Sequence, residues 1–143
     1  MGMHDFVGSW KLVSVESRDT EGKPIYPYGV NPAGMIVYDS RGNMSVQIMD
    51  PNCPRFVSQD QHSGSFEEIK LAFEGYTAYY GTYEINENDG IVIHQVTGSM
   101  YPNRIGKDQI RFFKLNGDEL TLTTPPIAYR GSQRISTLKW KRM

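Results

Sequence analysis

The stretch Gly8-Ser9-Trp10-Lys11-Leu12-Val13-Ser14-Val15 decides how the rest of the chain is interpreted. Its aromatic and β-branched residues favour a first β-strand, which we expect over residues 8–19. Because side chains alternate between the faces of a strand, we expect Trp10, Leu12 and Ser14 on one face and Lys11, Val13 and Val15 on the other. A similar stretch, Ser136-Thr137-Leu138-Lys139-Trp140-Lys141-Arg142, lies near the far end. We predict that the intervening sheet curls until these two strands meet.

The composition is typical of a single globular domain. The chain has 143 residues, enough for one hydrophobic core, and we expect one domain over residues 1–143. No apolar run approaches the roughly 20 residues that a membrane-spanning helix needs. The first residues lack the basic and apolar pattern of a signal peptide. We therefore expect a cytoplasmic, intracellular protein with no membrane partner.

Charge is distributed unevenly along the chain. Residues 1–103 carry 6 basic and 13 acidic residues, a balance of −7, whereas residues 104–143 carry 9 basic and 3 acidic, a balance of +6. The basic residues occur singly within strand patterns and form no block, and a closed barrel would bring the two halves together. We therefore expect no nucleic-acid partner.

Turn signals divide the chain into short segments of strand character. The strongest is Asp89-Gly90, a dipeptide typical of a tight hairpin turn. Pro27 limits the segment at 25–29 to at most an edge piece or part of a rim. Besides the first strand, we expect strands over residues 34–39, 43–50, 76–86, 91–97, 107–115, 119–124 and 132–142.

One helix is expected, over about residues 65–75. Ser65 is its predicted N-cap and Glu68 occupies the capping-box position. Phe66, Ile69 and Phe73 form an apolar stripe, so this helix is expected to plug or flank one end of the barrel. The irregular stretch 51–65 and the segment Tyr101-Pro102-Asn103 are the candidate rims of a pocket. The predicted fold is therefore all-β: a single antiparallel up-and-down barrel of about 8–10 strands with one short helix.

Several motifs along the chain together resemble those of the lipocalin-like domain proteins of bacteria and fungi, within the wider calycin group. The residues that carry the resemblance are Gly8-x-Trp10-x-Leu12; Tyr26-Pro27-Tyr28-Gly29; Gly34-Met35-Ile36-Val37-Tyr38; Gly42-Asn43-Met44-Ser45-Val46-Gln47; Pro54-Arg55-Phe56; Ala78-Tyr79-x-Gly81-x-Tyr83-Glu84; His94; Pro102-Asn103; Gln109-x-Arg111; and Leu120-Thr121-Leu122-x-Thr124-Pro125-Pro126.

The resemblance implies a barrel of eight or more antiparallel strands around a central cavity. It also implies that a cation from the last strand packs across the first-strand Trp and closes one end. Arg142 is the best match for that cation, so Trp10 and Arg142 are expected to have a structural role. Some relatives resemble cyclases or isomerases, so the resemblance leaves the function open.

A barrel of this size holds one small ligand, and its interior side chains can be predicted from the alternation of each strand. The polar residues predicted inside are Tyr38, Gln47, Tyr79, Tyr83, His94, Gln109 and Arg111. A buried polar group without a partner costs about 1–3 kcal/mol. These residues therefore either satisfy one another or bind a polar ligand.

Arg111 and His94 are the sharpest candidates. An inward Arg111 would anchor an acidic head group; alternatively, it lies against Tyr faces with water, or its predicted facing is wrong by one residue. His94 would act as a general acid or base, with Tyr79 or Tyr83 polarising a carbonyl. Alternatively, His94 is a neutral core histidine hydrogen-bonded to a Tyr.

The leading hypothesis is a protein that binds a small, partly apolar molecule with an acidic or phenolic end, using Tyr38, Gln47, Tyr79, Tyr83, His94, Gln109 and Arg111. The first alternative is a cofactor-independent isomerase, cyclase or dehydratase of a biosynthetic pathway, with His94 and Tyr79 catalytic. The second is a barrel with a filled core that serves as an interaction module. We predict no cofactor and no metal, because the three His are scattered, and either a monomer or a homodimer.

Overall fold

The computed structural model describes residues 2–143. In chain order the elements are α1 (Met3–Phe6), β1 (Gly8–Asp19), β2 (Pro24–Ile25), β3 (Ala33–Tyr38), β4 (Asn43–Met49), α2 (Phe66–Glu74), β5 (Tyr76–Asn86), β6 (Ile91–Ser99), the 3-10 helix η1 (Pro102–Arg104), β7 (Asp108–Asn116), β8 (Glu119–Thr123), β9 (Ile127–Tyr129) and β10 (Ser132–Arg142). The predicted strands and the predicted helix are all present. The sequence analysis did not anticipate α1, η1 or β9.

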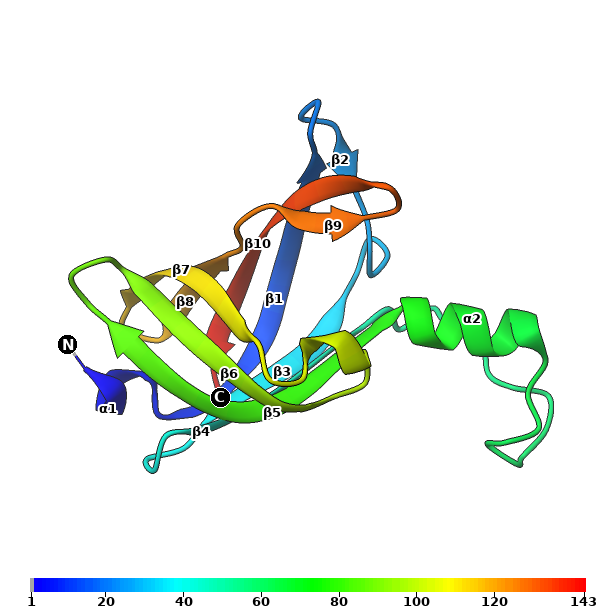
Figure 1. Cartoon of the computed structure of the whole chain (residues 1–143), viewed down its shortest axis with the longest axis horizontal. Coiled ribbons are helices and arrows are strands. Elements are labelled where there is room, and N and C mark those ends of the chain that lie inside the picture. Colours follow the sequence, from blue (N-terminus) through cyan, green and yellow to red (C-terminus); the bar gives the residue numbers. More distant parts are fainter. Residues whose placement is uncertain (1) are drawn as a thin grey trace.

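Eight antiparallel strands form a closed barrel. They follow the order β1-β3-β4-β5-β6-β7-β8-β10, and the pairing of β1 with β10 closes the ring. The short strands β2 and β9 extend β1 and β10 at one end of the barrel (Figure 1). The predicted meeting of the first and last strands is thus confirmed, with Trp10 opposite Arg142.

A β-bulge in β1 changes the predicted faces of that strand. Leu12 pairs with Trp140, but Ser14 pairs with Lys139, so Val13 is an extra residue in β1. Beyond the bulge the alternation is shifted by one residue. The prediction that Ser14 shares a face with Trp10 is therefore wrong.

The β3–β4 hairpin also differs from the prediction. Tyr38 pairs with Met44, and Ile36 pairs with Val46. The side chains of Met44, Val46 and Ile48 are buried, which leaves Gln47 on the outer face. The turn is centred on Arg41 as predicted, since the Asp39 amide donates to the Asn43 carbonyl and the Asp39 carboxylate accepts from the amides of Arg41 and Asn43. In this register residues 44, 46 and 48 face inward with Ile36 and Tyr38, so the predicted inward facing of Gln47 is wrong by one residue.

Strands β5, β6 and β7 have the predicted facing. Tyr79 and Tyr83 of β5 are buried, as is His94 of β6. Tyr83 pairs with His94, and His94 pairs with Gln109 of β7. Gln109 and Arg111 are half-buried on the same inner face. These three strands therefore bring polar side chains into the interior.

An aromatic layer fills the end of the barrel beside α1. Phe6 of α1 is fully buried and makes edge-to-face contacts with Tyr38 and Phe113, with ring centroids 5.4 and 5.0 Å apart. The Trp10 indole donates a 2.9 Å hydrogen bond to the Phe6 carbonyl. Because α1 joins the aromatic core, any cavity must open at the other end.

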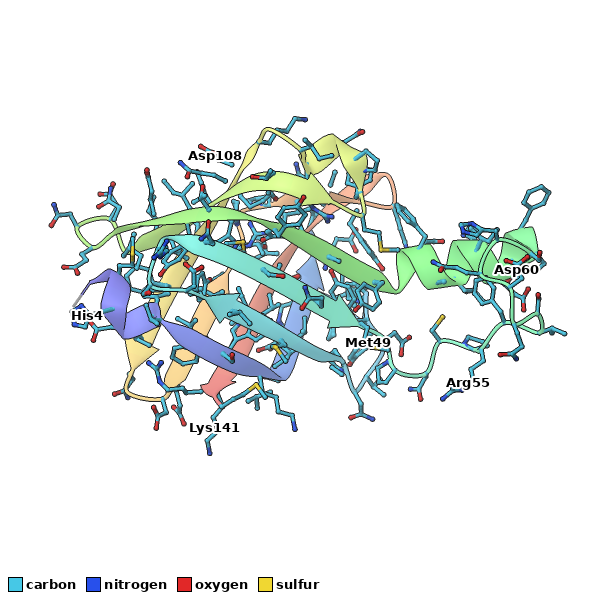
Figure 2. The ribbon with its side chains drawn as sticks, turned by 90° about the horizontal axis from the view of Figure 1, so that it is seen from below. His4, Met49, Arg55, Asp60, Asp108 and Lys141 are labelled. Atoms are coloured by element: carbon cyan, nitrogen blue, oxygen red, sulfur yellow. The ribbon has the colours of Figure 1, made fainter. Side chains whose placement is uncertain are left out.

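Helix α2 extends away from the barrel on the side opposite α1 (Figures 1 and 2). None of its residues is buried, and Phe66 is 93% exposed. Arg55 and Asp60 of the preceding loop lie beside it, far from His4 (Figure 2). The predicted capping box is present, since Ser65 and Glu68 bond each other's backbone amides. Of the two predicted roles, the helix flanks one end of the barrel and does not plug it: Phe66 is exposed, whereas Phe73 contacts Tyr101, the residue before η1.

Candidate functional site

The barrel contains a cavity of about 70 Å³ that continues into a space open to solvent. Its walls combine an apolar surface with a group of polar side chains. The lining residues are Tyr28, Ile36, Val46, Ile48, Thr77, Tyr79, His94, Arg104, Gln109, Arg111, Leu122, Thr124, Ile127, Arg134, Ser136, Leu138 and Trp140. In this structure the cavity is smaller than the sites of about 300–1,000 Å³ in which proteins usually bind small molecules, so a ligand requires lining side chains to move.

Three arginines and no carboxylate line this cavity. Arg104 comes from η1, Arg111 from β7 and Arg134 from β10. Within residues 2–143, none of the three forms an ion pair with Asp or Glu. Arg111 donates to the Ile110 carbonyl at 2.8 Å, and Arg134 donates to the Ser136 hydroxyl at 3.2 Å. The cavity therefore holds positive charge that the described part of the chain does not neutralise.

Tyrosine rings flank two of these arginines. The Arg104 guanidinium lies 5.9 Å from the ring centroid of Tyr79 and 5.3 Å from that of Tyr101. The Arg134 guanidinium lies 5.7 Å from that of Tyr28 and 5.3 Å from that of Tyr129. Such cation–π contacts help to hold each guanidinium in place. They leave its in-plane N–H groups free to bind an acceptor.

The pKa of Arg104 is affected by its burial and by the neighbouring arginines and tyrosines. Burial lowers the pKa of the Arg104 guanidinium, and the positive charges of Arg111 and Arg134 lower it further, while Tyr28 and Tyr79 act in the opposite direction. An anion placed among the three guanidinium groups would relieve their mutual repulsion.

A second hollow adjoins the cavity at its open end. Tyr28, Thr77, Arg104 and Arg134 line both spaces. The outer hollow is also bordered by side chains of α2, η1 and β9, and Phe73 and Tyr101 are in ring contact there at 6.5 Å. Arg104 and Arg134 thus lie at the mouth, between the inner cavity and the outer hollow.

A buried His94 connects two tyrosines. Its Nε2 lies 2.7 Å from the Tyr38 hydroxyl, and its Nδ1 lies 2.7 Å from the Tyr79 hydroxyl. Burial, assisted by the charge of Arg111, lowers the pKa of His94 to about 3. The imidazole is therefore neutral at pH 7, so one nitrogen donates and the other accepts. The structure thus shows His94 as a core histidine hydrogen-bonded to Tyr side chains, while its acid–base role stays a prediction.

The two phenols beside His94 are un-ionised. Burial raises the pKa of Tyr38 well above its ordinary value. Burial also raises the pKa of Tyr79, although the nearby Arg111 acts in the opposite direction. Tyr79 therefore presents a neutral phenol to the cavity, and its hydroxyl is hydrogen-bonded to Nδ1 of His94.

Comparison with known proteins agrees with this architecture. A family model described as a lipocalin-like domain matches residues 7–143. The chain belongs to the lipocalin-like domain family. It is also 37% identical, over 107 residues, to the 4'-hydroxy-3'-methoxypropiophenone carrier protein of Aspergillus oryzae (strain ATCC 42149 / RIB 40), a match that covers 70% of this chain and 96% of the relative. The lipocalin-like barrel and this relationship support small-molecule binding in general.

The lipocalin-like barrel brings only some of the predicted ligand contacts into one cavity. Tyr79, His94, Gln109 and Arg111 line it together. Tyr38 lies outside the lining and reaches His94 from the aromatic core. The other two predicted contacts, Tyr83 and Gln47, lie outside the cavity.

Tyr83 and Gln47 do not line the cavity. The Tyr83 hydroxyl donates to the Asp39 carbonyl at 2.8 Å, and its ring packs against Tyr38. Burial raises the pKa of Tyr83 to about 12. Gln47 bonds Ser45 on the outer face of the lipocalin-like barrel.

Several lining residues were missed by the sequence analysis. Arg134 and Trp140 both lie on the face of β10 that includes Leu138, so extending that alternation towards residue 134 would have found Arg134. Tyr28 was not named as a contact, although its segment 25–29 was predicted to be an edge piece or part of a rim. Arg104 directly follows the predicted rim Tyr101-Pro102-Asn103, but the irregular 3-10 turn has no alternation from which the facing of Arg104 could be predicted. The loop 51–65, a predicted rim, lines neither the cavity nor the outer hollow.

Among residues 2–143, no helix has both the length and the apolar character needed to cross a membrane. The same residues contain no cluster of three or more His, Cys, Asp or Glu side chains able to hold a metal ion.

Proposed function

We propose that this lipocalin-like protein is a carrier of a small, partly apolar molecule with an acidic or phenolic group. The observation that carries the proposal is the arrangement of Arg104, Arg111 and Arg134 around a cavity without a lining carboxylate. A buried or half-buried Arg is costly without an anionic partner. A ligand carboxylate or phenolate would supply that partner through charge-assisted hydrogen bonds.

The rest of the cavity suits the apolar part of such a ligand. Ile36, Val46 and Ile48 form one wall, and Leu122 and Leu138 belong to the facing strands. The relative from Aspergillus oryzae is named for a ligand that combines a phenol, a methoxy group and an aryl ketone. A molecule of that chemical class has both the apolar ring and the phenolic end that this cavity favours.

The catalytic alternative depends on His94 and Tyr79. His94 lines the cavity, but both of its ring nitrogens are already bonded to phenols, so neither is free to exchange a proton with a ligand. A histidine with a pKa of about 3 is also a weak base near neutral pH. These two observations favour binding over cofactor-independent isomerisation, cyclisation or dehydration.

The test compares charged and neutral ligands of matched shape. We would titrate the protein with 4'-hydroxy-3'-methoxypropiophenone, 4-propylbenzoate and neutral 4-propylbenzamide by isothermal titration calorimetry. The benzoate is expected to bind about 10-fold more tightly than the benzamide, since it forms charge-assisted bonds. The proposal fails if neither the phenol nor the benzoate binds, or if the benzamide binds as tightly as the benzoate.

Single substitutions distinguish the contribution of the cavity arginines to affinity from the effect of removing any positive charge. Arg104→Gln and Arg134→Gln should each bring the affinity for 4-propylbenzoate close to that for the benzamide. Arg55→Gln is the matched control, because Arg55 is exposed in the loop before α2 and lines neither space. His94→Gln distinguishes a carrier from an enzyme: a carrier keeps most of its affinity, whereas an enzyme that uses His94 loses turnover.

A further inference from the structure

Two buried side-chain donors in residues 2–143 have no hydrogen-bond partner, and both line the same cavity. They are Nε1 of Trp140 and Nε of Arg134. Buried polar atoms in folded proteins are almost always hydrogen-bonded to protein, water or ligand. Because both unpartnered donors belong to residues that line the candidate ligand site, each marks a position at which a ligand could place an acceptor atom.

The two tryptophans of the protein differ in this respect. The Trp10 indole donates to the Phe6 carbonyl at 2.9 Å, and this bond belongs to the closed end of the barrel. Trp140 is only 2% exposed, yet its indole N–H has no acceptor. Buried indoles usually find a hydrogen-bond partner, so Trp140 departs from the rule that Trp10 follows.

The unpartnered donors lie at different depths. Trp140 and Arg134 both face inward on β10, six residues apart, which corresponds to about 20 Å between their Cα atoms along a strand. Arg134 borders the outer hollow as well as the cavity, and so marks the mouth. Trp140 pairs with Leu12 and Leu120, towards the closed end.

The chemistry at the two depths also differs. Around Arg134 the mouth includes Arg104, so the local charge favours an anion. The strand neighbours of Trp140, namely Leu12 and Leu120, are buried and apolar. An indole N–H donates but cannot accept, and an apolar environment disfavours a second ionised group. The acceptor that suits Trp140 is therefore a neutral oxygen, such as a ketone carbonyl or an ether.

We propose that Trp140 is a specificity determinant that binds a neutral oxygen at the inner end of the ligand, while the acidic or phenolic end stays at the mouth beside Arg104 and Arg134. This inference rests on the proposed carrier function and adds an orientation and a second recognition point. The ligand class that it defines has an apolar body with an anionic or phenolic group at one end and a carbonyl or ether oxygen at the other.

The experiment uses pairs of carboxylates that differ only in the inner oxygen. One series attaches a carboxylate to a 4-propionylphenyl ring directly or through two or four methylene groups. The matched series has a 4-propylphenyl ring, in which a methylene replaces the carbonyl. Wild-type protein and Trp140→Phe are titrated with both series. This substitution keeps an aromatic ring and removes the N–H donor.

We expect Trp140→Phe to weaken the best-binding ketone acid by about five- to tenfold, the effect of one neutral hydrogen bond. Its matched propyl acid should bind both proteins within about twofold, because a general change of packing affects the two ligands alike. The spacer length that gives the largest difference reports the separation between the mouth and Trp140.

A second measurement does not depend on the variant. In wild-type protein labelled with ¹⁵N, the indole N–H signals of Trp10 and Trp140 are followed during titration. The ketone acid should shift the Trp140 signal downfield, the matched propyl acid should shift it less, and the Trp10 signal should stay in place in both titrations. If Trp140→Phe does not fold, this comparison alone decides the matter.

The outcomes separate the two proposals. If wild-type protein binds none of the carboxylates, the carrier function proposed above fails, and this inference fails with it. If carboxylates bind but Trp140→Phe weakens both members of each pair equally, or both members shift the Trp140 signal equally, then the carrier function stands and the role of Trp140 is overturned. Water would then satisfy the indole.

Discussion

The Arg142 guanidinium lies 4.2 Å from the ring centroid of Trp10, and this contact joins the last strand of the barrel to the first. The same side chain donates to the carbonyls of Val7 and Asp5, at 2.7 and 2.8 Å. It also contacts Asp118 in the β7–β8 turn at 3.1 Å. Arg142 therefore ties three separate parts of the chain together at the closed end.

Replacing Arg142 with Gln should lower the free energy of unfolding by about 2–3 kcal/mol, since it removes a cation–π contact and leaves two carbonyls without their donor. Urea denaturation at pH 7 measures the change. Lys141→Gln on the same strand is the control, because Lys141 is exposed, and its effect should stay within about 0.5 kcal/mol. Equal effects of the two substitutions would show that the contact does not contribute to stability.

The neutral His94 makes stability depend on pH. In the unfolded chain its imidazole gains a proton as the pH falls below the ordinary value of 6.5, whereas in the native protein it stays neutral until about pH 3. Protons therefore bind preferentially to the unfolded state in this window. The contribution of His94 to stability is complete above pH 6.5 and decreases, by at most about 1.4 kcal/mol per pH unit, as the pH falls towards 3.

His94→Gln should remove this dependence, because a glutamine does not titrate. The measurement is the urea unfolding free energy at several pH values between 7.5 and 5, where the carboxylates contribute little. His62→Gln is the control, since His62 is exposed in the loop before α2. If the wild-type protein and His94→Gln lose stability at the same rate across this range, then native His94 is not held neutral.

Gly81 has a specific packing role in β5. The pairing of β5 with β6 is irregular between Tyr80 and Gly81, and a Cβ at Gly81 would collide with the backbone carbonyl of Gln95. Gly81→Ala should therefore lower the free energy of unfolding by about 2 kcal/mol or more, as overpacking does elsewhere. Glu84→Ala, at an exposed position of the same strand, should change stability by less than about 0.5 kcal/mol. A fully stable Gly81→Ala protein, by the same urea measurement, would contradict this packing.

Helix α2 is expected to depend on its cap more than on packing, because none of its residues is buried. The Ser65 hydroxyl accepts from the Glu68 amide, and the Glu68 carboxylate accepts from the amides of Ser65 and Val57, which lowers the pKa of Glu68. Ser65→Ala should reduce the protection of α2 amides by about fivefold, corresponding to ~1 kcal/mol. Amide hydrogen exchange measures this, with the exposed Gln61→Ala as control.

Global stability is the second readout for Ser65→Ala. Since α2 extends from the barrel, its loosening should leave the urea midpoint of the whole domain unchanged. A drop in that midpoint would mean that α2 and the barrel unfold as one cooperative unit, contrary to the exposure of the helix.

The order of strands and their closure were predictable because they depend on local signals. Alternating apolar residues, the turn at Asp89-Gly90 and the capping residues of α2 act within a few positions of the chain. The facing of Tyr79, His94 and Arg111 followed from the same alternation, because the bulge between β5 and β6 lies at Thr97, beyond the inward residues of β6. The resemblance of Trp10 and Arg142 to the closing pair of calycins extended this reasoning to a contact between the two ends of the chain.

Local patterns were insufficient where one residue changes the register. The extra Val13 in β1 shifts the alternation by one position, so Val15 and not Ser14 faces the core. Such a bulge is decided by which backbone groups bond across the sheet, and it leaves no distinct signal in the hydrophobic pattern. The facing of Gln47 was predictable, because the predicted turn pairs Tyr38 with Met44, and the apolar residues Met44, Val46 and Ile48 alternate along β4.

The sequence by itself determined that this chain folds into a closed antiparallel barrel with an unusually polar interior, because strand alternation and turn residues are local properties. Only the tertiary structure decided what that interior recognises. Arg104, Arg111 and Arg134 come from a 3-10 turn and two separate strands, and they meet because the barrel closes. Whether Trp140 keeps a free N–H depends on every atom around its indole, and that environment exists only in the folded chain.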